Sequence, residues 1–302
     1  MNTAPIIVFS YNRPDHFQKT IDALSKNDLA SDSILYIYCD GLKQNASEEQ
    51  AVLVEKCKSI AYSVVGFREV RIVERDKNLG LASNIVQAVS EIVNHYGRVI
   101  VLEDDLVTSP FFLRFMNEAL DIYETEDRVM HISGYMWPHK GKLPDIFMSD
   151  IPNSWGWATW RRAWEYFIED ASFLYHIFEY RWTEFNKLGG DFLQRQLVDN
   201  YNGKLHTWYI KWYATILLRN GLTIYPGESL VDNIGMDGSG TNCSSSSAFT
   251  NTQLGNRLSI KKVPLSVNKK ATREMYVFYQ GRWYNKRRRK RLISKIIEFF
   301  KF

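Results

Sequence analysis

Short apolar runs alternate with amphipathic segments through the first hundred residues of the chain. The runs are rich in β-branched residues and occupy residues 6–9, 34–39, 70–73 and 99–102. Between them, apolar residues recur at helical spacing, as at Phe17, Ile21 and Leu24, and residues 81–96 form a second such segment. Strands that alternate with helices are typical of a parallel sheet covered on both faces. The pattern predicts an α/β fold with a mostly parallel, Rossmann-like sheet flanked by helices.

Polar residues follow the carboxyl ends of these apolar runs. They are Ser10, Arg13, Asp40, Asn78 and an acidic triplet formed by Glu103, Asp104 and Asp105. Ligands of open α/β sheets bind beyond these strand ends, so we expect the side chains to share one rim. Carboxylates suit Mg²⁺ or Mn²⁺, because Mg²⁺ in particular combines one or two of them with phosphate oxygens of a substrate. The rim is therefore predicted to bind a metal-bound nucleoside diphosphate.

Simpler structural roles exist for the same residues. Asp104, Asp105 and Ser109 are residue types that cap a following helix. Arg13 would then be a surface arginine and Asp40 a turn aspartate. The chain has neither a GxGxxG motif nor a P-loop lysine motif, so the sequence does not support dinucleotide or P-loop chemistry.

Four short motifs resemble the GT-A glycosyltransferases, and most closely the group related to N-acetylglucosaminyltransferase I. They are FSYNRP near the amino terminus, CDG at residues 39–41, RDKNLGLASN at residues 75–84, and VLEDDL followed by SP at residues 101–110. The likeness extends over roughly the first two thirds of the chain, and EDDL is its most specific part. The resemblance implies a GT-A fold.

The resemblance also implies roles for the rim residues. In that family the acidic triplet is the local form of the DxD motif, so Asp105 is expected to bind Mn²⁺ or Mg²⁺. Glu103 and Asp104 are expected to contact the ribose and uridine of the donor. Asp40 would hold the base, and Arg13 would lie near the diphosphate or the base. A UDP-sugar is the favoured donor.

A second concentrated signal is a cluster of four tryptophans at positions 155, 157, 160 and 164. Aromatic rings offer large rigid surfaces at low entropic cost, which suits stacking on sugars. Trp155, Gly156 and Trp157 precede a predicted helix and resemble a segment that shapes the acceptor side in related transferases. Trp160 and Trp164 are spaced to share one helix face, so a core role is equally open to them.

The general base is the least defined part of the predicted site. Residues 205–220 are predicted to form a helix that ends at an Asn-Gly capping signal, followed by a strand at residues 222–225. Many inverting GT-A enzymes carry an acid at the start of the equivalent helix, where this chain has Tyr209 and Ile210. His206 and Asp199 are the neighbouring candidates for the base, and Lys211 is the candidate for neutralising the leaving diphosphate. Ordinary structural roles remain open for all three.

A polar segment rich in Gly, Ser and Asn occupies residues 229–247 and is predicted to be a loop. Loops of this length in compact domains commonly act as lids or binding loops. Related metal-dependent enzymes sometimes supply a histidine to the metal from such a loop, and Asn242 stands at the corresponding place. Either Asp105, phosphates and water alone hold the metal, or Asp237 contributes.

The length of 302 residues and a hydrophobic share of 45% allow a substantial core. We expect one catalytic domain over residues 1–280, with a nucleotide-sugar-binding half at 1–110 and an acceptor-binding half at 111–280. Cys39, Cys57 and Cys243 lack the spacing of a disulfide framework or a zinc site, which suits a reducing cytoplasm. The sequence contains no secretory signal pattern and no apolar run of about 18 residues, so a cytoplasmic location is expected.

The carboxyl-terminal segment, residues 281–302, has a different character. Six consecutive cations occupy residues 286–291, and apolar residues then recur at helical spacing. A basic amphipathic helix of this kind suits an anionic membrane surface. A solvated tail or a helix packed on the domain are the alternatives, and nothing else in the chain indicates nucleic-acid binding.

The sequence thus predicts a metal-dependent transferase that moves a sugar from a nucleotide-sugar to a hydroxyl of a glycan or lipid-linked saccharide. Inversion at the anomeric carbon is favoured, in surface polysaccharide or glycan biosynthesis. Two alternatives stay open: a nucleotidyltransferase, and a noncatalytic carbohydrate-binding protein on a degenerate transferase scaffold.

Overall fold

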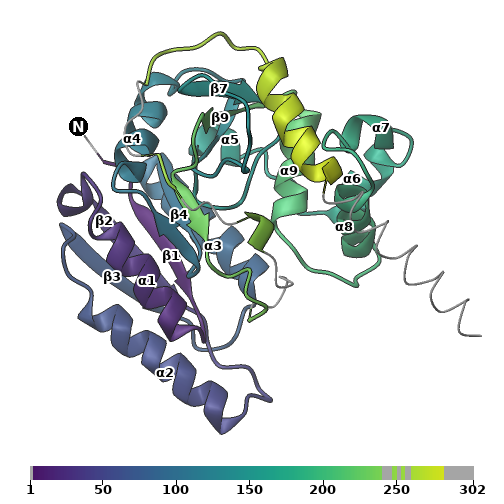
Figure 1. Cartoon of the computed structure of the whole chain (residues 1–302). Coiled ribbons are helices and arrows are strands. Elements are labelled where there is room, and N and C mark those ends of the chain that lie inside the picture. The colour runs from purple at the N-terminus through teal and green to yellow at the C-terminus, as the bar shows by residue number, and fades with distance from the viewer. Residues whose placement is uncertain (1–2, 240–246, 250–252, 256–259, 282–302) are drawn as a thin grey trace, which may run out of the picture.

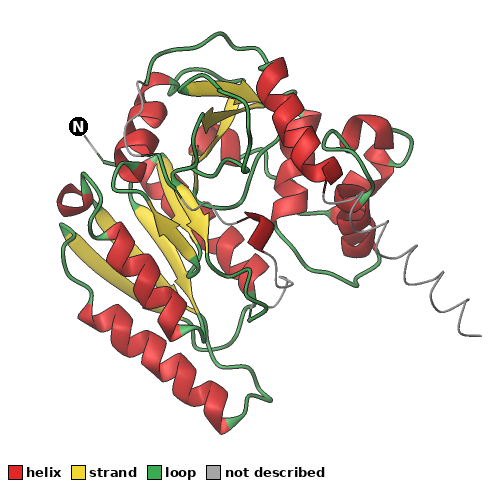
Figure 2. Ribbon diagram, viewed as in Figure 1, coloured by secondary structure: helices red, strands yellow, loops and turns green. Residues whose placement is uncertain are grey.

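A computed structural model describes residues 3–239, 247–249, 253–255 and 260–281. Its centre is an eight-stranded sheet of order β3-β2-β1-β4-β8-β6-β9-β7, with helices on both sides (Figure 2). The strands are β1 (Ile6–Ser10), β2 (Ile34–Cys39), β3 (Glu69–Glu74), β4 (Arg98–Leu102), β6 (Val129–Ser133), β7 (Ile146–Ser149), β8 (Trp157–Trp160) and β9 (Leu222–Pro226). A second, two-stranded sheet pairs β5 (Leu106–Thr108) with β10 (Val231–Asn233). The predicted fold class is confirmed.

The helices cover the sheet from the two sides. They are α1 (Pro14–Leu24), α2 (Glu48–Ser63), α3 (Leu81–Tyr96), α4 (Phe112–Ile122), α5 (Arg161–Trp164), α6 (Ala171–Phe178), α7 (Trp182–Phe185), α8 (Phe192–Tyr201) and α9 (Tyr209–Leu218), with short 3-10 turns at Ala30–Asp32 and Ser247–Phe249. One buried cluster joins α1, α2 and α4 to the sheet, and a second joins α3 and α9 to its other face.

The first four strands form the parallel half that the alternating pattern predicts. β1 pairs in parallel with β2 and with β4, and β2 pairs in parallel with β3. β1, β2 and β4 are buried almost throughout, which explains their continuous apolar runs. Helix α3 has the predicted bounds and ends at Gly97, which adopts φ +81°. The carboxyl ends of these strands therefore meet at one rim.

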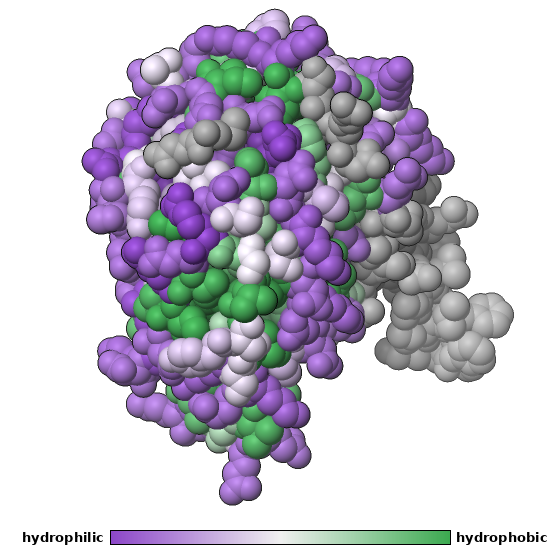
Figure 3. All heavy atoms as spheres, turned by 90° about the vertical axis from the view of Figure 1, so that its left-hand side faces the viewer, coloured by the Kyte–Doolittle hydropathy of each residue, from purple (hydrophilic) through white to green (hydrophobic). Residues whose placement is uncertain are grey.

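Strand β3 lies at the open edge of the sheet and is only partly buried. The face of the molecule on this side shows an apolar area among hydrophilic residues (Figure 3). Exposed apolar side chains on the nearby segments include Val65, whose exposure is 79%, and Tyr62, whose exposure is 67%. Edge strands of this kind leave backbone groups without a sheet partner on one side.

The second half of the sheet departs from the predicted pattern. β8 runs antiparallel between β4 and β6, while β6 and β9 are parallel. Trp160 ends strand β8, so the expectation that a helix carries both Trp160 and Trp164 is wrong; α5 begins at the next residue.

Helix α9 begins at Tyr209, four residues after the predicted start at residue 205. It ends as the Asn-Gly signal indicates: Asn220 adopts φ +51°, and the Gly221 N–H donates to the Ile216 carbonyl at 2.8 Å. These are the features of a Schellman-type cap. The Tyr213 hydroxyl of α9 donates to the Phe185 carbonyl of α7 at 2.5 Å. This bond connects the short helices α6, α7 and α8 to the helix that packs on the sheet.

Residues 269–281 form a further helix that the sequence did not reveal. It crosses the β7 side of the sheet (Figure 1), and its Ala271 and Met275 side chains are fully buried there. The basic tail predicted at residues 281–302 lies outside the described residues apart from its first glycine. Within the described ranges, no helix is long and apolar enough to span a membrane. The division at residues 110 and 280 stays a prediction.

Candidate functional site

The acidic triplet lies where strand β4 ends and the chain turns into β5. Two contacts fix its backbone: the Thr20 hydroxyl donates to the Asp104 carbonyl at 2.8 Å, and the Ile234 N–H donates to the Asp105 carbonyl at 2.9 Å. The first contact comes from α1 and the second from the segment after β10. The carboxylates therefore stand between two elements that are distant in sequence from each other.

Arg13 is the cation that faces the triplet. It precedes α1, and its Nη2 atom lies 2.9 Å from Asp105 Oδ2 and also contacts Asp104 Oδ1. Its Nε–H reaches Asp104 Oδ2 at 3.4 Å. Asp104 and Asp105 are both almost completely buried. One guanidinium thus neutralises part of a site that holds three acids.

Two carboxyl groups of the triplet, those of Asp104 and Glu103, have raised pKa values. Burial raises the pKa of Asp104 to about 6, with the nearby Asp105 carboxylate acting in the same direction and Arg13 opposing it. Burial and the two neighbouring aspartates raise the pKa of Glu103 as well. Groups that resist ionisation at a strand end indicate that the folded chain alone does not balance their charge.

One atom of Arg13 points to a missing partner. Within the described residues, its Nη1 is buried and donates to no hydrogen-bond acceptor of the protein. Buried polar groups are nearly always hydrogen-bonded, so an unpaired guanidinium nitrogen is an unusual feature. It lies beside the triplet, where an anionic ligand oxygen would satisfy it.

Asp40 anchors a loop instead of presenting free oxygens. Its Oδ1 accepts the N–H groups of Gly41 at 3.0 Å and Leu79 at 2.9 Å. Its Oδ2 accepts Gly80 N–H at 3.0 Å and Asn78 Nδ2 at 3.1 Å. A carboxylate offers about four acceptor sites, so these bonds use its capacity. Asp40 and Asn78 together hold the β3–α3 connection against the end of β2.

The rim is continuous between its two parts. The Asp40 N–H donates to the Ser10 carbonyl at 3.0 Å, which joins the end of β1 to the end of β2. Ser10 and Arg13 are separated by only two residues. The structure thus brings together Ser10, Asp40 and Asn78 on one side and Arg13 with the triplet on the other, as the sequence predicts.

The segment after β10 approaches Asp105 and also pairs with helix α1. A Cβ atom at Gly235 would lie 2.0 Å from Asp105 Oδ2, so only glycine fits there without displacement. Asp237 pairs with His16 Nε2 at 3.1 Å and with the Ser239 N–H at 2.9 Å. The Ser239 bonds, with a smaller effect from His16, lower the pKa of Asp237 to about 2. Asn242 lies outside the described residues.

The donor set at the triplet fits a divalent cation that is completed by a substrate. Among the described residues, no three His, Cys, Asp or Glu side chains are grouped so that they hold a metal by themselves. Mg²⁺ sites commonly use one or two carboxylates and take further oxygens from phosphate and water. Asp105, with surplus acid charge beside it, meets that requirement.

The tryptophan segment is divided between surface and interior. Trp155 is half-buried and contacts the Tyr135 and Phe249 rings at centroid distances of 4.6 and 5.3 Å. Gly156 adopts φ +65°, and a side chain there would meet Val231. Trp157 is 1% exposed and belongs to the hydrophobic core. Of the three predicted acceptor residues, Trp155 alone is partly open to solvent.

The three candidates for proton and charge transfer lie in different places. His206 is exposed, with Nε2 at 3.2 Å from the Ser83 hydroxyl near the start of α3. Asp199 is half-buried in α8. Lys211 is 6% exposed in α9; burial lowers its pKa, while Glu169 and Asp170 oppose the shift. Within the described part of the chain, no hydrogen bond or ion pair joins any of them to the triplet.

Sequence similarity places the chain near one characterised transferase. No protein-family profile matches it. It is 24% identical over 184 residues to an alpha-1,3-mannosyl-glycoprotein 2-beta-N-acetylglucosaminyltransferase of Arabidopsis thaliana, a match that covers 55% of this chain and 39% of that protein. The resemblance to the glycosyltransferases is thereby confirmed. The chain spans about two fifths of the length of this relative, and the narrower group stays a prediction.

Solved structures give more distant likenesses. One is the mannosyltransferase PcManGT of Pyrobaculum calidifontis in complex with GDP-Man and Mn²⁺, at 13% identity and a TM-score of 0.34 over 53% of this chain and 44% of that chain. Another is mouse xyloside xylosyltransferase 1, at 13% identity and 0.34 over 70% and 80%. A third is a UDP-glucose pyrophosphorylase complexed with UDP-glucose, at 9% identity and 0.38 over 74% and 90%.

Three residues of the site were not identified from the sequence: Thr20, His16 and Gly235. Thr20 and His16 belong to α1, and their polar side chains face the rim at helix positions that read as ordinary surface residues. Gly235 lies in a segment already rich in glycine. No local signal separates it from its neighbours, because its role depends on the approach of Asp105.

Proposed function

We propose that this protein is a metal-dependent glycosyltransferase that moves a sugar from a nucleotide-sugar donor to an acceptor hydroxyl. The observation that carries the proposal is the acidic triplet, with its two buried aspartates and a single arginine, at the carboxyl ends of parallel strands. Such a rim is where open α/β sheets bind nucleotides. The similarity to an N-acetylglucosaminyltransferase supports the same activity.

In this proposal Asp105 holds Mn²⁺ or Mg²⁺, which would act as a Lewis acid on the departing diphosphate. Arg13 lies where its unpaired Nη1 would donate to a diphosphate oxygen. Glu103 and Asp104 would contact the nucleoside. Asp40 contributes by fixing the loop at residues 78–80 rather than by a free carboxylate, because its four bonds are already made.

The acceptor side of the proposal rests on the half-buried Trp155, which would stack on a sugar ring beside the rim. A base takes the proton from the acceptor hydroxyl as its oxygen attacks the anomeric carbon, and the diphosphate leaves. His206 is the better-placed candidate for the base, because its ring is exposed and contacts α3 near the loop at residues 78–80, which we call the rim loop. Inversion, a UDP-sugar donor and a lipid-linked or glycan acceptor complete the proposal.

The experiment is metal-dependent hydrolysis of a panel of UDP-, GDP-, CMP- and dTDP-sugars by the wild type and by Asp105→Ala. We expect Mn²⁺-dependent release of one nucleotide, and its loss in the variant with the fold intact by circular dichroism. Full activity in Asp105→Ala would refute the assignment. Release of pyrophosphate from a nucleoside triphosphate would instead indicate a nucleotidyltransferase.

A further inference from the structure

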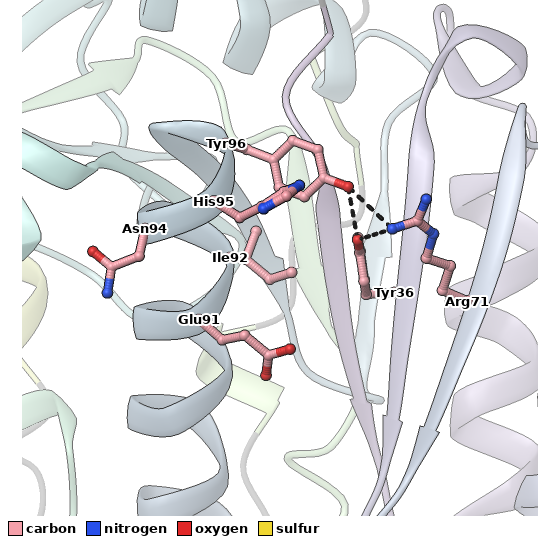
Figure 4. Close-up of a pocket in the computed structure, with 7 residues that line it drawn as sticks. All are labelled: Tyr36, Arg71, Glu91, Ile92, Asn94, His95 and Tyr96. Carbon is pink, nitrogen blue, oxygen red and sulfur yellow. Dashed lines mark hydrogen bonds between the residues drawn. The ribbon is translucent and has the colours of Figure 1, made fainter.

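An open cavity of about 530 Å³ lies between helix α3 and strands β2 and β3, on a part of the sheet that α3 leaves uncovered (Figure 4). Its walls include Tyr36 and Arg71 from the strands, and Glu91, Ile92, His95 and Tyr96 from the helix. The volume is in the range of ligand sites in proteins. The proposed transfer reaction makes no use of this cavity.

The polar groups of the cavity converge on one point. Tyr36 and Arg71 face each other across the paired strands, and Arg71 Nη1 donates to the Tyr36 hydroxyl at 2.6 Å and to the Tyr96 hydroxyl at 3.2 Å. The two hydroxyls lie 2.8 Å apart. Figure 4 shows the three groups meeting at the upper end of the cavity. Burial and the Tyr96 hydroxyl raise the pKa of Tyr36 to about 12, so the Tyr36 phenol keeps its proton at neutral pH.

The Arg71 guanidinium of the cavity is already paired with a carboxylate, which argues against an anionic ligand. Glu69 accepts from Arg71 Nε at 2.6 Å and from Nη2 at 3.1 Å. This pair of donors is therefore not available for bidentate binding of a phosphate or carboxylate. Glu91 adds a carboxylate whose Oε2 accepts the Tyr38 hydroxyl at 3.2 Å. An anion would meet this carboxylate, whereas a neutral ligand with many hydroxyls could both donate to it and accept from the phenols.

We propose that the cavity formed by Tyr36, Arg71, Glu91, Ile92, His95 and Tyr96 is an accessory binding site for a neutral oligosaccharide. Tyr96 and Ile92 supply an apolar wall for the C–H face of a sugar ring. The hydroxyl groups of Tyr36 and Tyr96, the Glu91 carboxylate and the His95 ring supply both donors and acceptors for sugar hydroxyls.

This site is separate from the acidic triplet. Tyr36 lies four residues before Asp40 along β2, which corresponds to roughly 13 Å of strand. The cavity borders the last turns of α3, whereas the rim loop immediately precedes the first turn. A saccharide in the cavity would therefore leave the rim free. The proposal stands on the chemistry of the cavity and does not require that the protein be a transferase.

The test measures binding of short neutral oligosaccharides of glucose, galactose, mannose and N-acetylglucosamine by saturation-transfer NMR. Tyr96→Ala and Glu91→Gln change the cavity, and Tyr180→Ala is the matched control, because Tyr180 is 90% exposed and does not line it. We expect at least one oligosaccharide to bind the wild type, the Tyr180→Ala variant and Asp105→Ala alike. The two cavity variants should bind it about tenfold more weakly, a loss of the size expected for one hydrogen bond.

Three results would overturn the proposal. One is the absence of binding by any of the oligosaccharides to the wild type. Another is unchanged binding by both cavity variants. The third is loss of binding in Asp105→Ala, which would place the saccharide at the rim. Glu91 is exposed, so its variant remains informative if Tyr96→Ala fails to fold. Donor hydrolysis, measured in parallel, reports on the transferase activity independently of this site.

Discussion

Single residues decide the electrostatics of the rim. The sequence is enough to single out Glu103, Asp104 and Asp105, because three acids after a buried run are costly without a cation. It does not reveal that Arg13 bridges two of them, since 91 residues separate Arg13 from Asp104. Nor does it reveal that the Asp40 carboxylate accepts hydrogen bonds from backbone N–H groups, because only the folded β3–α3 loop brings those groups close to it.

The first prediction concerns Arg13. Arg13→Met leaves two buried carboxylates without their cation, so the free energy of unfolding should fall by about 3 kcal/mol, the typical loss for one partner of a buried pair. Mn²⁺ should restore part of this loss, because it binds the same acids. Urea denaturation with and without Mn²⁺ measures both effects.

Arg181→Met is the control for that experiment. Arg181 pairs with Glu184 at the surface, where a salt bridge contributes about 1 kcal/mol or less. Mn²⁺ should change the free energy of unfolding of this variant by the same amount as that of the wild type. A loss in Arg13→Met that Mn²⁺ does not reduce would argue against a metal at the triplet.

At the scale of elements, the parallel half of the sheet is predictable and the second half is not. Residues 34–39 and 81–96 have the predicted bounds, because the strand is marked by a continuous apolar run and the helix by apolar residues at helical spacing. Strand β8 has four residues, three of them aromatic or alanine, and its position between β4 and β6 depends on distant pairing. Residues 129–133 show a β-bulge in the pairing of β6 with β9, which blurs the boundary further.

The second prediction concerns the segment that follows β10. Gly235→Ala places a methyl group against Asp105, at 2.0 Å from Oδ2 and 2.8 Å from Cβ in the present geometry. We expect a loss of about 2 kcal/mol in stability, typical of overpacking, together with weaker metal-dependent nucleotide binding. Thermal unfolding and calorimetry measure the two effects.

Gly281→Ala serves as the matched substitution, since a Cβ there meets nothing within 4 Å. It should leave nucleotide binding unchanged. If Gly235→Ala behaves like Gly281→Ala in both measurements, then the β10 segment does not position Asp105 in solution.

At the scale of the whole molecule, His131 links the sheet to α9. Its Nδ1 accepts the Trp212 indole N–H at 3.1 Å, and its Nε2 contacts the Asn153 carbonyl at 2.8 Å, so the ring is neutral with its proton on Nε2. Burial lowers the pKa of His131 to about 3. The unfolded chain, with a histidine pKa near 6.5, therefore binds the proton first as the pH falls.

The third prediction follows from this difference. His131 contributes its full stability above about pH 6.5, and the contribution falls by about 1.4 kcal/mol per unit as the pH drops toward 3. Between pH 7 and 5 the wild type should lose about 2 kcal/mol more than His131→Gln, which cannot titrate. Urea denaturation at the two pH values measures this difference. Equal pH dependence in the two proteins would show that His131 is not buried in the neutral form.

The most direct test of the whole account is calorimetric titration of UDP, GDP, dTDP and CMP into the wild type and Asp105→Ala, with and without Mn²⁺. The account predicts that one nucleotide binds the wild type in the presence of Mn²⁺, and that binding is lost when either the metal or the Asp105 carboxylate is removed. Binding that is equally strong without Mn²⁺ and in Asp105→Ala, or no binding at all, would contradict it.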